Sequence, residues 1–135
     1  MTTLYTTTVT NTGGRSGEVF TEDKSFHLQV AAPGSKNTDA TNPEQLFAAG
    51  YSACFNSALE VVMRKQKIKS ASTVKGTVNL LKDESDGGFK ISVELEVEIA
   101  DLDQAQTQEL ANIAHTVCPY SKATSGNIDV TIKAI

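Results

Sequence analysis

The chain has 135 residues, 39% of them hydrophobic and 21% charged, with a formal net charge of −4. This length and composition predict one globular domain with a hydrophobic core and exclude extensive disorder. A net negative charge without a Lys/Arg stripe argues against nucleic acid as a partner. No stretch approaches the roughly 20 apolar residues that a membrane span needs, so we expect no membrane association. The first residues lack signal-peptide features, which favours a cytoplasmic protein.

The first third of the chain is predicted to form β structure. In its last segment Phe26, Leu28 and Val30 alternate with polar residues, which is the period of a half-buried strand. The expected strands cover residues 4–10, 18–23 and 25–31.

A glycine-rich turn, Gly13-Gly14-Arg15-Ser16-Gly17, separates the first two of these strands. Three glycines in five residues indicate a backbone that needs unusual φ/ψ angles or a close approach to other atoms. Arg15 in this turn is either an exposed hairpin residue or a cation with a function.

A long helix is predicted from Pro43 to about Lys65. Asn42 is a favourable N-cap, Pro43 suits the first helical position and Gln45 is placed for a capping box. Residues 46–63 are apolar or small nearly all round, so we expect this helix to be buried at the centre of the fold.

The second half predicts a hairpin, a second helix and a last strand. Apolar residues in 89–99 alternate with lysine, serine and glutamate, as in a sheet with one solvated face. The expected elements are strands at 73–81, 89–99 and 127–134, a turn at 83–88 and a helix from 103 to 117. The order βββ-α-ββ-α-β predicts an α+β fold with mainly antiparallel sheets around the buried helix.

Two cysteines, Cys54 and Cys118, are either inert buried thiols or a reactive pair. Cys118 precedes Pro119, which ends one helix and can begin another, so its thiol is expected near an N-cap where peptide dipoles favour the thiolate. Cys54 lies within the buried helix, where burial raises the pKa of a thiol and reactivity requires a nearby cation.

Three other side chains could assist a reactive thiol. Arg15 could supply the cation. Glu44 either complements the helix dipole or holds Arg15 in a bidentate pair. His115 lies one helical turn before Cys118 and could contact it, although a dipole partner at a helix C-terminus is the alternative.

Other chemistries fit the sequence less well. The two cysteines and two histidines lack zinc-finger spacing, so we expect no metal site. A cysteine hydrolase would use a Cys-His pair but leaves the second cysteine unexplained. No Walker or Rossmann glycine pattern supports a nucleotide cofactor.

Three motifs carry a family resemblance: Gly13–Gly17, Thr41–Phe55 (TNPEQLFAAGYSACF) and Val117–Thr124 (VCPYSKAT). Together they closely resemble the OsmC/Ohr family, and specifically its organic hydroperoxide resistance branch. The resemblance spans nearly the whole chain. It implies a single OsmC/Ohr-type domain over residues 1–135 and an intertwined homodimer whose subunits share sheets and bury the central helices.

The resemblance also implies a thiol-dependent peroxidase that reduces alkyl and fatty-acid hydroperoxides to alcohols and serves oxidative stress resistance. Cys54 would be the peroxidatic residue, forming a sulfenic acid, and Cys118 the resolving residue that closes the disulfide. Arg15 and Glu44 would be the activating pair, so the family assigns the attack to Cys54 although the helix-cap argument favours Cys118. Dihydrolipoyl groups of a lipoylated partner protein would be the external reductant, with no bound cofactor.

Aromatic residues beside Cys54, namely Phe47, Tyr51 and Phe55, could line an apolar substrate pocket, although each could equally belong to the core. Two other functions stay open. One is a stress peroxidase of the OsmC branch, and the other is a non-enzymatic redox sensor or binding protein that uses the same disulfide as a switch.

Overall fold

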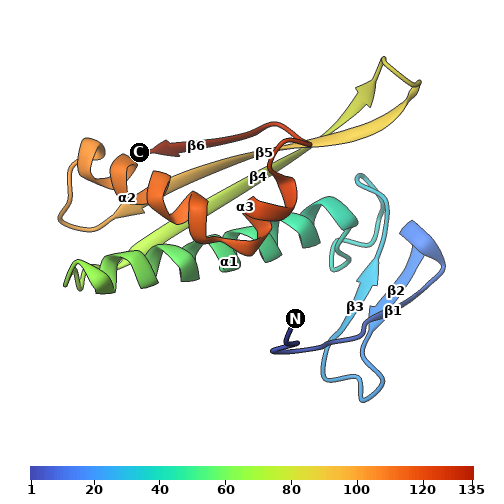
Figure 1. Ribbon diagram of the computed structural model, residues 1–135. Coiled ribbons are helices and arrows are strands. Elements are labelled where there is room, and N and C mark those ends of the chain that lie inside the picture. The colour runs from blue at the N-terminus through green and yellow to red at the C-terminus, as the bar shows by residue number, and fades with distance from the viewer. The chain divides into compact units, whose positions relative to one another are not determined.

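The computed structural model describes residues 1–135, which divide into two compact units, residues 1–46 and 47–135. Each unit contains one three-stranded sheet, and helix α1 (Pro43–Lys65) begins in the first unit and continues through the second (Figure 1). The fold class is α+β, as predicted. The expectation of one domain over residues 1–135 stays a prediction.

The first unit is an antiparallel sheet with the strand order β1-β2-β3. Its elements are β1 (Thr10–Thr12), the 3-10 turn η1 (Gly14–Ser16), β2 (Gly17–Phe20) and β3 (His27–Val30). The expected strand at 4–10 is wrong except at its last residue, because no strand of the chain pairs with residues 4–9 and a strand forms only against a hydrogen-bonding partner. The expected alternation in β3 buries only Val30, while Phe26 and Leu28 remain exposed.

The second unit contains a long hairpin of β4 (Ser72–Asp83) and β5 (Gly88–Ile99), joined by β6 (Val130–Ala134). The hairpin pairs in register from Ser72↔Ile99 to Asp83↔Gly88. β6 runs parallel to β5, because the connection between them passes through helices and returns the chain in the same direction.

The helix boundaries follow the predicted caps. α2 (Gln104–Val117) starts with a complete capping box between Asp103 and Gln106, and α3 (Pro119–Thr124) starts directly after Cys118. At the start of α1 the Asn42 side chain accepts a hydrogen bond from the Gln45 N–H at 2.8 Å, so the predicted N-cap is correct. The predicted capping box is wrong, since the Gln45 side chain instead accepts from the Thr41 hydroxyl at 2.7 Å.

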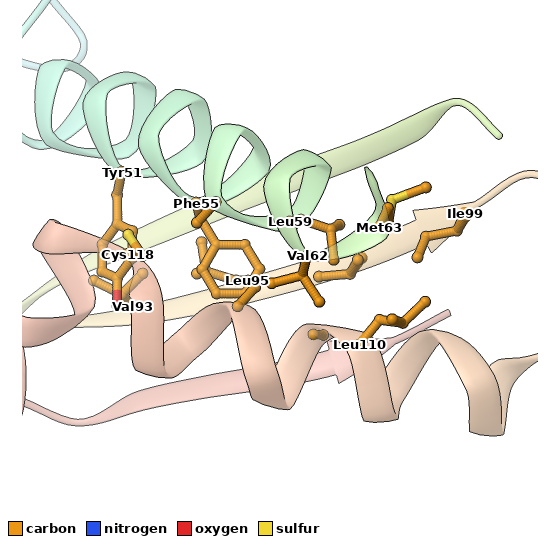
Figure 2. Packing of buried hydrophobic residues seen from close by; sticks show 14 residues of the cluster. Tyr51, Phe55, Leu59, Val62, Met63, Val93, Leu95, Ile99, Leu110 and Cys118 are labelled. Atoms are coloured by element: carbon orange, nitrogen blue, oxygen red, sulfur yellow. The ribbon is translucent and has the colours of Figure 1, made fainter. Parts of the chain in front are cut away.

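The core of the second unit lies between α1, α2 and one face of the sheet (Figure 2). In β5 the apolar residues Val93, Leu95 and Val97 are buried, while Glu94 and Glu98 face solvent, so the predicted alternation is confirmed from Val93 onward. It is wrong at Phe89, which is 77% exposed because the start of β5 extends beyond the helices (Figure 1). Burying a large apolar side chain contributes roughly 1.5–3 kcal/mol. This core therefore holds α1 and α2 on the same sheet face.

Small residues allow α1 to approach β4 closely. A Cβ added to Gly76 of β4 would collide with the Ser52 hydroxyl and lie 3.3 Å from the Ala48 carbonyl oxygen. α1 is the long central helix that was expected, although within one chain only one of its faces packs in the core. The opposite stripe is exposed and consists of Ala49, Ala53, Ser57 and Glu60.

Helix α1 is also long and apolar enough to cross a membrane by length and composition, contrary to the expectation that no such stretch exists. The core helix of a globular protein passes the same test. Tyr51, Phe55 and Leu59 of α1 are fully buried in the core of the second unit, which accounts for the apolar composition.

Candidate active site

The two cysteines meet in the second unit although they are far apart in the sequence. Cys54 lies within α1 and is half-buried, whereas Cys118 lies between α2 and α3 and is fully buried. Both are free thiols, and Cys54 packs against the core cluster that contains Cys118, close enough for the Cys118 side chain to raise the pKa of Cys54. Because Cys54 keeps exposed surface and Cys118 has none, Cys54 is the thiol that a small molecule can reach.

The surroundings of Cys54 shift its acidity in two directions. Burial raises the pKa of the Cys54 thiol above its ordinary value, and the backbone N–H of Tyr120 lowers it by donating a hydrogen bond. The neighbouring Cys118 raises the pKa further. The net shift is upward, so the second unit by itself does not activate this thiol.

The backbone on both sides holds Cys118 in place. Its φ of −65° and ψ of 123° are extended, as Pro119 requires of the residue before it. The Cys118 N–H donates to the Ala114 carbonyl at 2.9 Å, and the Cys118 carbonyl accepts from the Lys122 N–H at 3.0 Å. Cys118 is thus the C-cap of α2 and the N-cap of α3, as the sequence predicted.

Aromatic rings gather one to two turns before Cys54 on α1. The Phe47 ring packs edge-on against Tyr51 and against Tyr120 of α3, with centroids 6.2 Å apart in both pairs. A Cβ at Gly50 would lie 2.7 Å from the Tyr120 hydroxyl, so a side chain there would force the Tyr120 ring to move away from the helix. Tyr120 is not among the predicted pocket residues, although a glycine inside a long helix is a signal of such close approach.

The three predicted pocket residues have different surroundings. Tyr51 and Phe55 have no exposed surface and belong to the core, whereas Phe47 is only partly buried. Tyr120, at 38% exposure, presents more surface than either core ring. Phe47 and Tyr120 are therefore the aromatic side chains of this group that a ligand can contact.

His115 does not hydrogen-bond to Cys118. Its Nδ1 lies 2.8 Å from the Ser121 hydroxyl of α3, and that hydroxyl lies 2.8 Å from the Tyr51 hydroxyl. His115 also sits in the last turn of α2, where a basic side chain complements the helix dipole.

In the first unit, Arg15 and Glu44 form a bidentate ion pair. Arg15 Nη1 donates to Glu44 Oε2 at 2.9 Å, and Nη2 donates to Oε1 at 2.7 Å. The Arg15 guanidinium holds the pKa of the Glu44 carboxyl below its ordinary value, mainly through these hydrogen bonds, while desolvation opposes the shift. The planar fork holds the guanidinium in one orientation, which a lysine could not reproduce.

The glycine-rich turn carries Arg15 on η1. Gly13 and Gly14 have φ angles of 81° and 59°, in the left-handed region that glycine tolerates. Gly17 lies against the Thr12 carbonyl so closely that a side chain would collide with it. Both expectations for this turn, an unusual backbone and a close approach, are confirmed.

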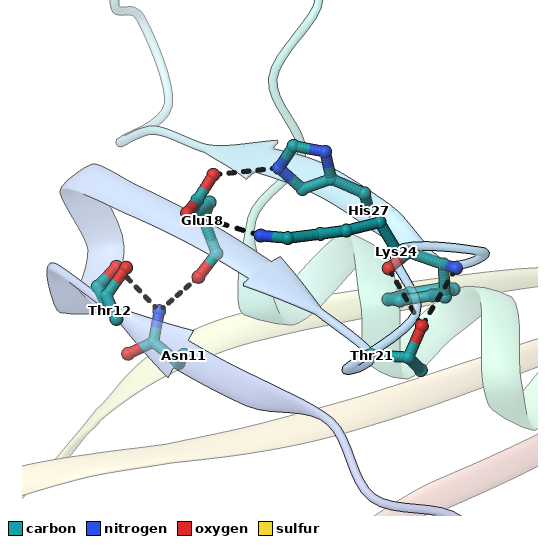
Figure 3. Close-up of polar contacts among 7 residues, drawn as sticks. Asn11, Thr12, Glu18, Thr21, Lys24 and His27 are labelled. Atoms are coloured by element: carbon teal, nitrogen blue, oxygen red, sulfur yellow. Dashed lines mark hydrogen bonds and ion pairs between the residues drawn. The ribbon is translucent and has the colours of Figure 1, made fainter.

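Asn11, which the sequence analysis missed, holds this turn together. Its Nδ2 donates to the carbonyls of Thr12, Gly14 and Glu18 at 3.2, 3.1 and 3.0 Å, and its Oδ1 accepts from the Gly14 N–H at 3.1 Å. Figure 3 shows the Asn11 amide between the Thr12 and Glu18 backbones. One amide group therefore links both strands that flank Arg15.

We expect Asn11→Ala to lower the free energy of unfolding by about 1–2 kcal/mol, because the freed backbone groups find only water as a replacement. Amide hydrogen exchange at residues 13–17 should accelerate as well. Asn37→Ala is the control, since the Asn37 Oδ1 accepts only one bond, from Asp39 N–H at 3.3 Å. Denaturant unfolding and exchange mass spectrometry measure both effects, and equal losses in the two variants would contradict a special role of Asn11.

Glu18 of β2 forms a second set of polar contacts, with His27 and Lys24 on the protein surface. Glu18 Oε2 lies 2.7 Å from His27 Nε2, and Glu18 Oε1 lies 4.0 Å from Lys24 Nζ (Figure 3). Solvent screens such exposed pairs, which contribute little stability. No group of three or more His, Cys, Asp or Glu side chains is arranged to hold a metal ion.

Comparison with known proteins agrees with this architecture. The family model described as OsmC-like protein matches residues 33–133, so the fold and the paired cysteines define an OsmC-like protein. The chain is 52% identical over 132 residues to the organic hydroperoxide resistance protein OhrB of Bacillus subtilis (strain 168), covering 96% of this chain and 97% of that protein. It is 51% identical over 134 residues to OhrA of the same strain, covering 96% and 95%.

The crystal structure of Bacillus subtilis OhrB matches with a TM-score of 0.93 and 50% identity, over 98% of this chain and 100% of that chain. The chain therefore belongs to the OsmC/Ohr family, in the branch of the organic hydroperoxide resistance proteins. The resemblance expected from the three sequence motifs is confirmed.

Proposed function

We propose that this protein is a thiol-dependent peroxidase that reduces organic hydroperoxides to alcohols and so serves oxidative stress resistance in the cytoplasm. The observation that carries the proposal is the proximity of the half-buried Cys54 to the buried Cys118 in the same core cluster. A sulfenic acid on the accessible thiol would have a partner thiol beside it. The relatives' name, organic hydroperoxide resistance protein, supplies the substrate class.

Arg15 is the proposed activator of Cys54. Burial raises the pKa of the Cys54 thiol, so a cation is needed to form the thiolate at neutral pH. Arg15, oriented by Glu44, would stabilise both this thiolate and the negative charge that develops on oxygen as the O–O bond breaks. The bidentate pair and the family resemblance of the Arg15 and Glu44 motifs support this role.

In the reaction, the Cys54 thiolate attacks one peroxide oxygen and the O–O bond breaks. The alkoxide leaves with a proton as the alcohol, and Cys54 becomes a sulfenic acid. The Cys118 thiol then displaces the hydroxyl group of the sulfenic acid, which forms the Cys54–Cys118 disulfide and releases water. A dithiol, proposed to be the dihydrolipoyl group of a partner protein, reduces this disulfide by exchange and becomes a disulfide itself.

An apolar wall would favour bulky hydroperoxides. Phe47 and Tyr120 provide accessible aromatic surface, and the buried rings of Tyr51 and Phe55 would support it from behind. Apolar surface of this kind binds the alkyl group of an organic hydroperoxide, whereas hydrogen peroxide has no alkyl group to contact it.

We further propose an intertwined homodimer, each chain forming a single domain. Two exposed regions of the chain support the homodimer. On α1 the small residues Ala49, Ala53 and Ser57 form an exposed stripe that would let two central helices pack closely. Leu4 and Tyr5 are 93% and 80% exposed and have no strand partner in their own chain, as expected of a segment that pairs with another subunit.

The proposal predicts that cumene hydroperoxide is reduced with a kcat/KM at least about tenfold above that for hydrogen peroxide, or about 1.4 kcal/mol of transition-state binding. Dihydrolipoamide should sustain turnover better than glutathione or thioredoxin. Stopped-flow peroxide consumption with each donor measures both. Equal efficiencies for the two peroxides would refute the apolar wall.

The same assay separates the peroxidase from a redox sensor. A sensor would form the Cys54–Cys118 disulfide once and would show no sustained consumption with any dithiol. Sustained turnover with dihydrolipoamide supports the peroxidase, and its absence refutes the proposed function.

A further inference from the structure

A buried hydrogen-bond cluster centred on Ser121 joins three helices beside the cysteines. We call Tyr51, His115, Ser121 and Thr124 the Ser121 cluster. The Ser121 hydroxyl lies 2.8 Å from the Tyr51 hydroxyl and 2.8 Å from His115 Nδ1, and Tyr51 OH lies 3.4 Å from Thr124 Oγ1. Ser121 is 1% exposed and Tyr51 is 0% exposed, so water does not compete for these bonds.

Each bond of the cluster ties together elements that carry the redox pair. Tyr51 precedes Cys54 by one helical turn on α1, and His115 precedes Cys118 by one turn on α2. Ser121 follows Cys118 by one turn on α3 and directly follows Tyr120, whose ring packs on Phe47 and Tyr51 of α1. Figure 2 shows Tyr51 pointing from α1 toward Cys118.

Helix α3, which carries Ser121 and Thr124, is too short to be stable by itself. α3 has only six residues, and so short a helix is unstable without tertiary contacts. Within α3 the buried side chains are Ser121 and Thr124, both polar, so no apolar residue of α3 is buried in the core. These polar contacts act together with the packing of the Tyr120 ring on Phe47 and Tyr51 to hold α3 against α1, and losing a buried hydrogen-bond partner is costly.

We propose that the Ser121 cluster positions the redox pair, holding α3 against α1 so that Cys118 stays within reach of the Cys54 sulfenic acid. This inference rests on the proposed peroxidase function. The cluster contributes no reacting atom, so its members are positioning residues. A loosened cluster lengthens the life of the sulfenic acid, which a second hydroperoxide then oxidises to the sulfinic acid while being reduced to an alcohol.

The test is a competition between disulfide and sulfinic acid. Wild type, Ser121→Ala, Tyr51→Phe and His115→Leu are treated with graded cumene hydroperoxide, and intact-protein mass spectrometry measures the ratio of sulfinic Cys54 to disulfide. We expect each variant to raise this ratio by about fivefold or more, as the loss of one buried hydrogen bond allows. His115→Asn should restore the wild-type ratio, because its amide places a polar atom near the position of Nδ1.

Gln108→Ala is the control for general destabilisation. The Gln108 side chain donates to the Ile132 carbonyl at 3.1 Å and accepts from the Ala134 N–H at 2.8 Å, so it ties α2 to β6 and not to α3. Equal sulfinic ratios in Gln108→Ala and the cluster variants would overturn the positioning role. If Ser121→Ala fails to fold, the contrast between His115→Leu and His115→Asn decides, and no difference between them overturns the inference.

The outcomes also separate the two proposals. A wild-type protein that consumes no hydroperoxide refutes the peroxidase function. A wild-type protein that forms the disulfide, with unchanged sulfinic ratios in all cluster variants, refutes the positioning role and leaves the peroxidase function standing.

Discussion

Cys54→Ser should abolish the consumption of organic hydroperoxide, whereas Cys118→Ser should consume about one equivalent per subunit and then stall. Cys54 is the half-buried thiol and Cys118 has no exposed surface, so only Cys54 can meet the peroxide. Without Cys118 the sulfenic acid has no partner thiol and accumulates or is oxidised further. Mass spectrometry after peroxide treatment should show the added oxygen atoms on Cys54 alone.

Ser85→Ala is the control for this pair, because Ser85 is exposed in the turn between β4 and β5 and lies outside the contact between the thiols. The opposite result is chemically conceivable, since Cys118 is the N-cap of α3 and peptide dipoles favour a thiolate there. A burst retained by Cys54→Ser and lost in Cys118→Ser would reverse the assignment of the two roles.

Arg15→Ala should lower kcat/KM by about 10²–10³-fold, the range found when one donor to a developing oxyanion is removed. Arg15→Lys should be nearly as poor, because an ammonium cannot face the thiolate while making the bidentate pair with Glu44. Arg64→Lys, in the last turn of α1, is the matched control and should retain activity. Steady-state kinetics with cumene hydroperoxide measures all three.

The Glu44 carboxylate should act only through Arg15. Glu44 and Cys54 are ten residues apart on α1, a rise of about 15 Å, so Glu44 cannot reach the thiol within the helix. Glu44→Ala should therefore lower activity, and adding it to Arg15→Ala should cost little more. Losses that simply add would show that Glu44 serves only the start of the helix.

The pH dependence of this pair has a definite sign. The pKa of Glu44 is lowered by Arg15, so the pair stabilises the protein above the ordinary pKa of a glutamate and is lost as the pH falls through the lowered value. Glu44 therefore stays ionised at neutral pH, and its titration should not shape the activity profile there.

Much of this fold follows from local sequence signals. Asn42 and Pro43 predicted the start of α1, Asp103 predicted the start of α2, and Pro119 predicted the break at Cys118. The apolar alternation in 89–99 predicted a strand with one solvated face. These predictions succeed because caps, proline restrictions and side-chain periodicity act over a few residues and need no distant partner.

The sequence by itself also supplied the proposed site residues, since Cys54, Cys118, Arg15 and Glu44 all stood out from their local settings or from the family motifs. The contacts of Cys54 with Cys118 and of Arg15 with Glu44 were expected through the family resemblance, and only the tertiary structure shows them. Each of these contacts joins residues from distant segments, as do the bonds of the Ser121 cluster. Spacing along the chain does not specify which helix faces meet. The lack of strand structure at residues 4–9 and the exposed stripe on α1 were missed for the same reason: a strand needs a neighbour and a helix face needs a surface to cover it.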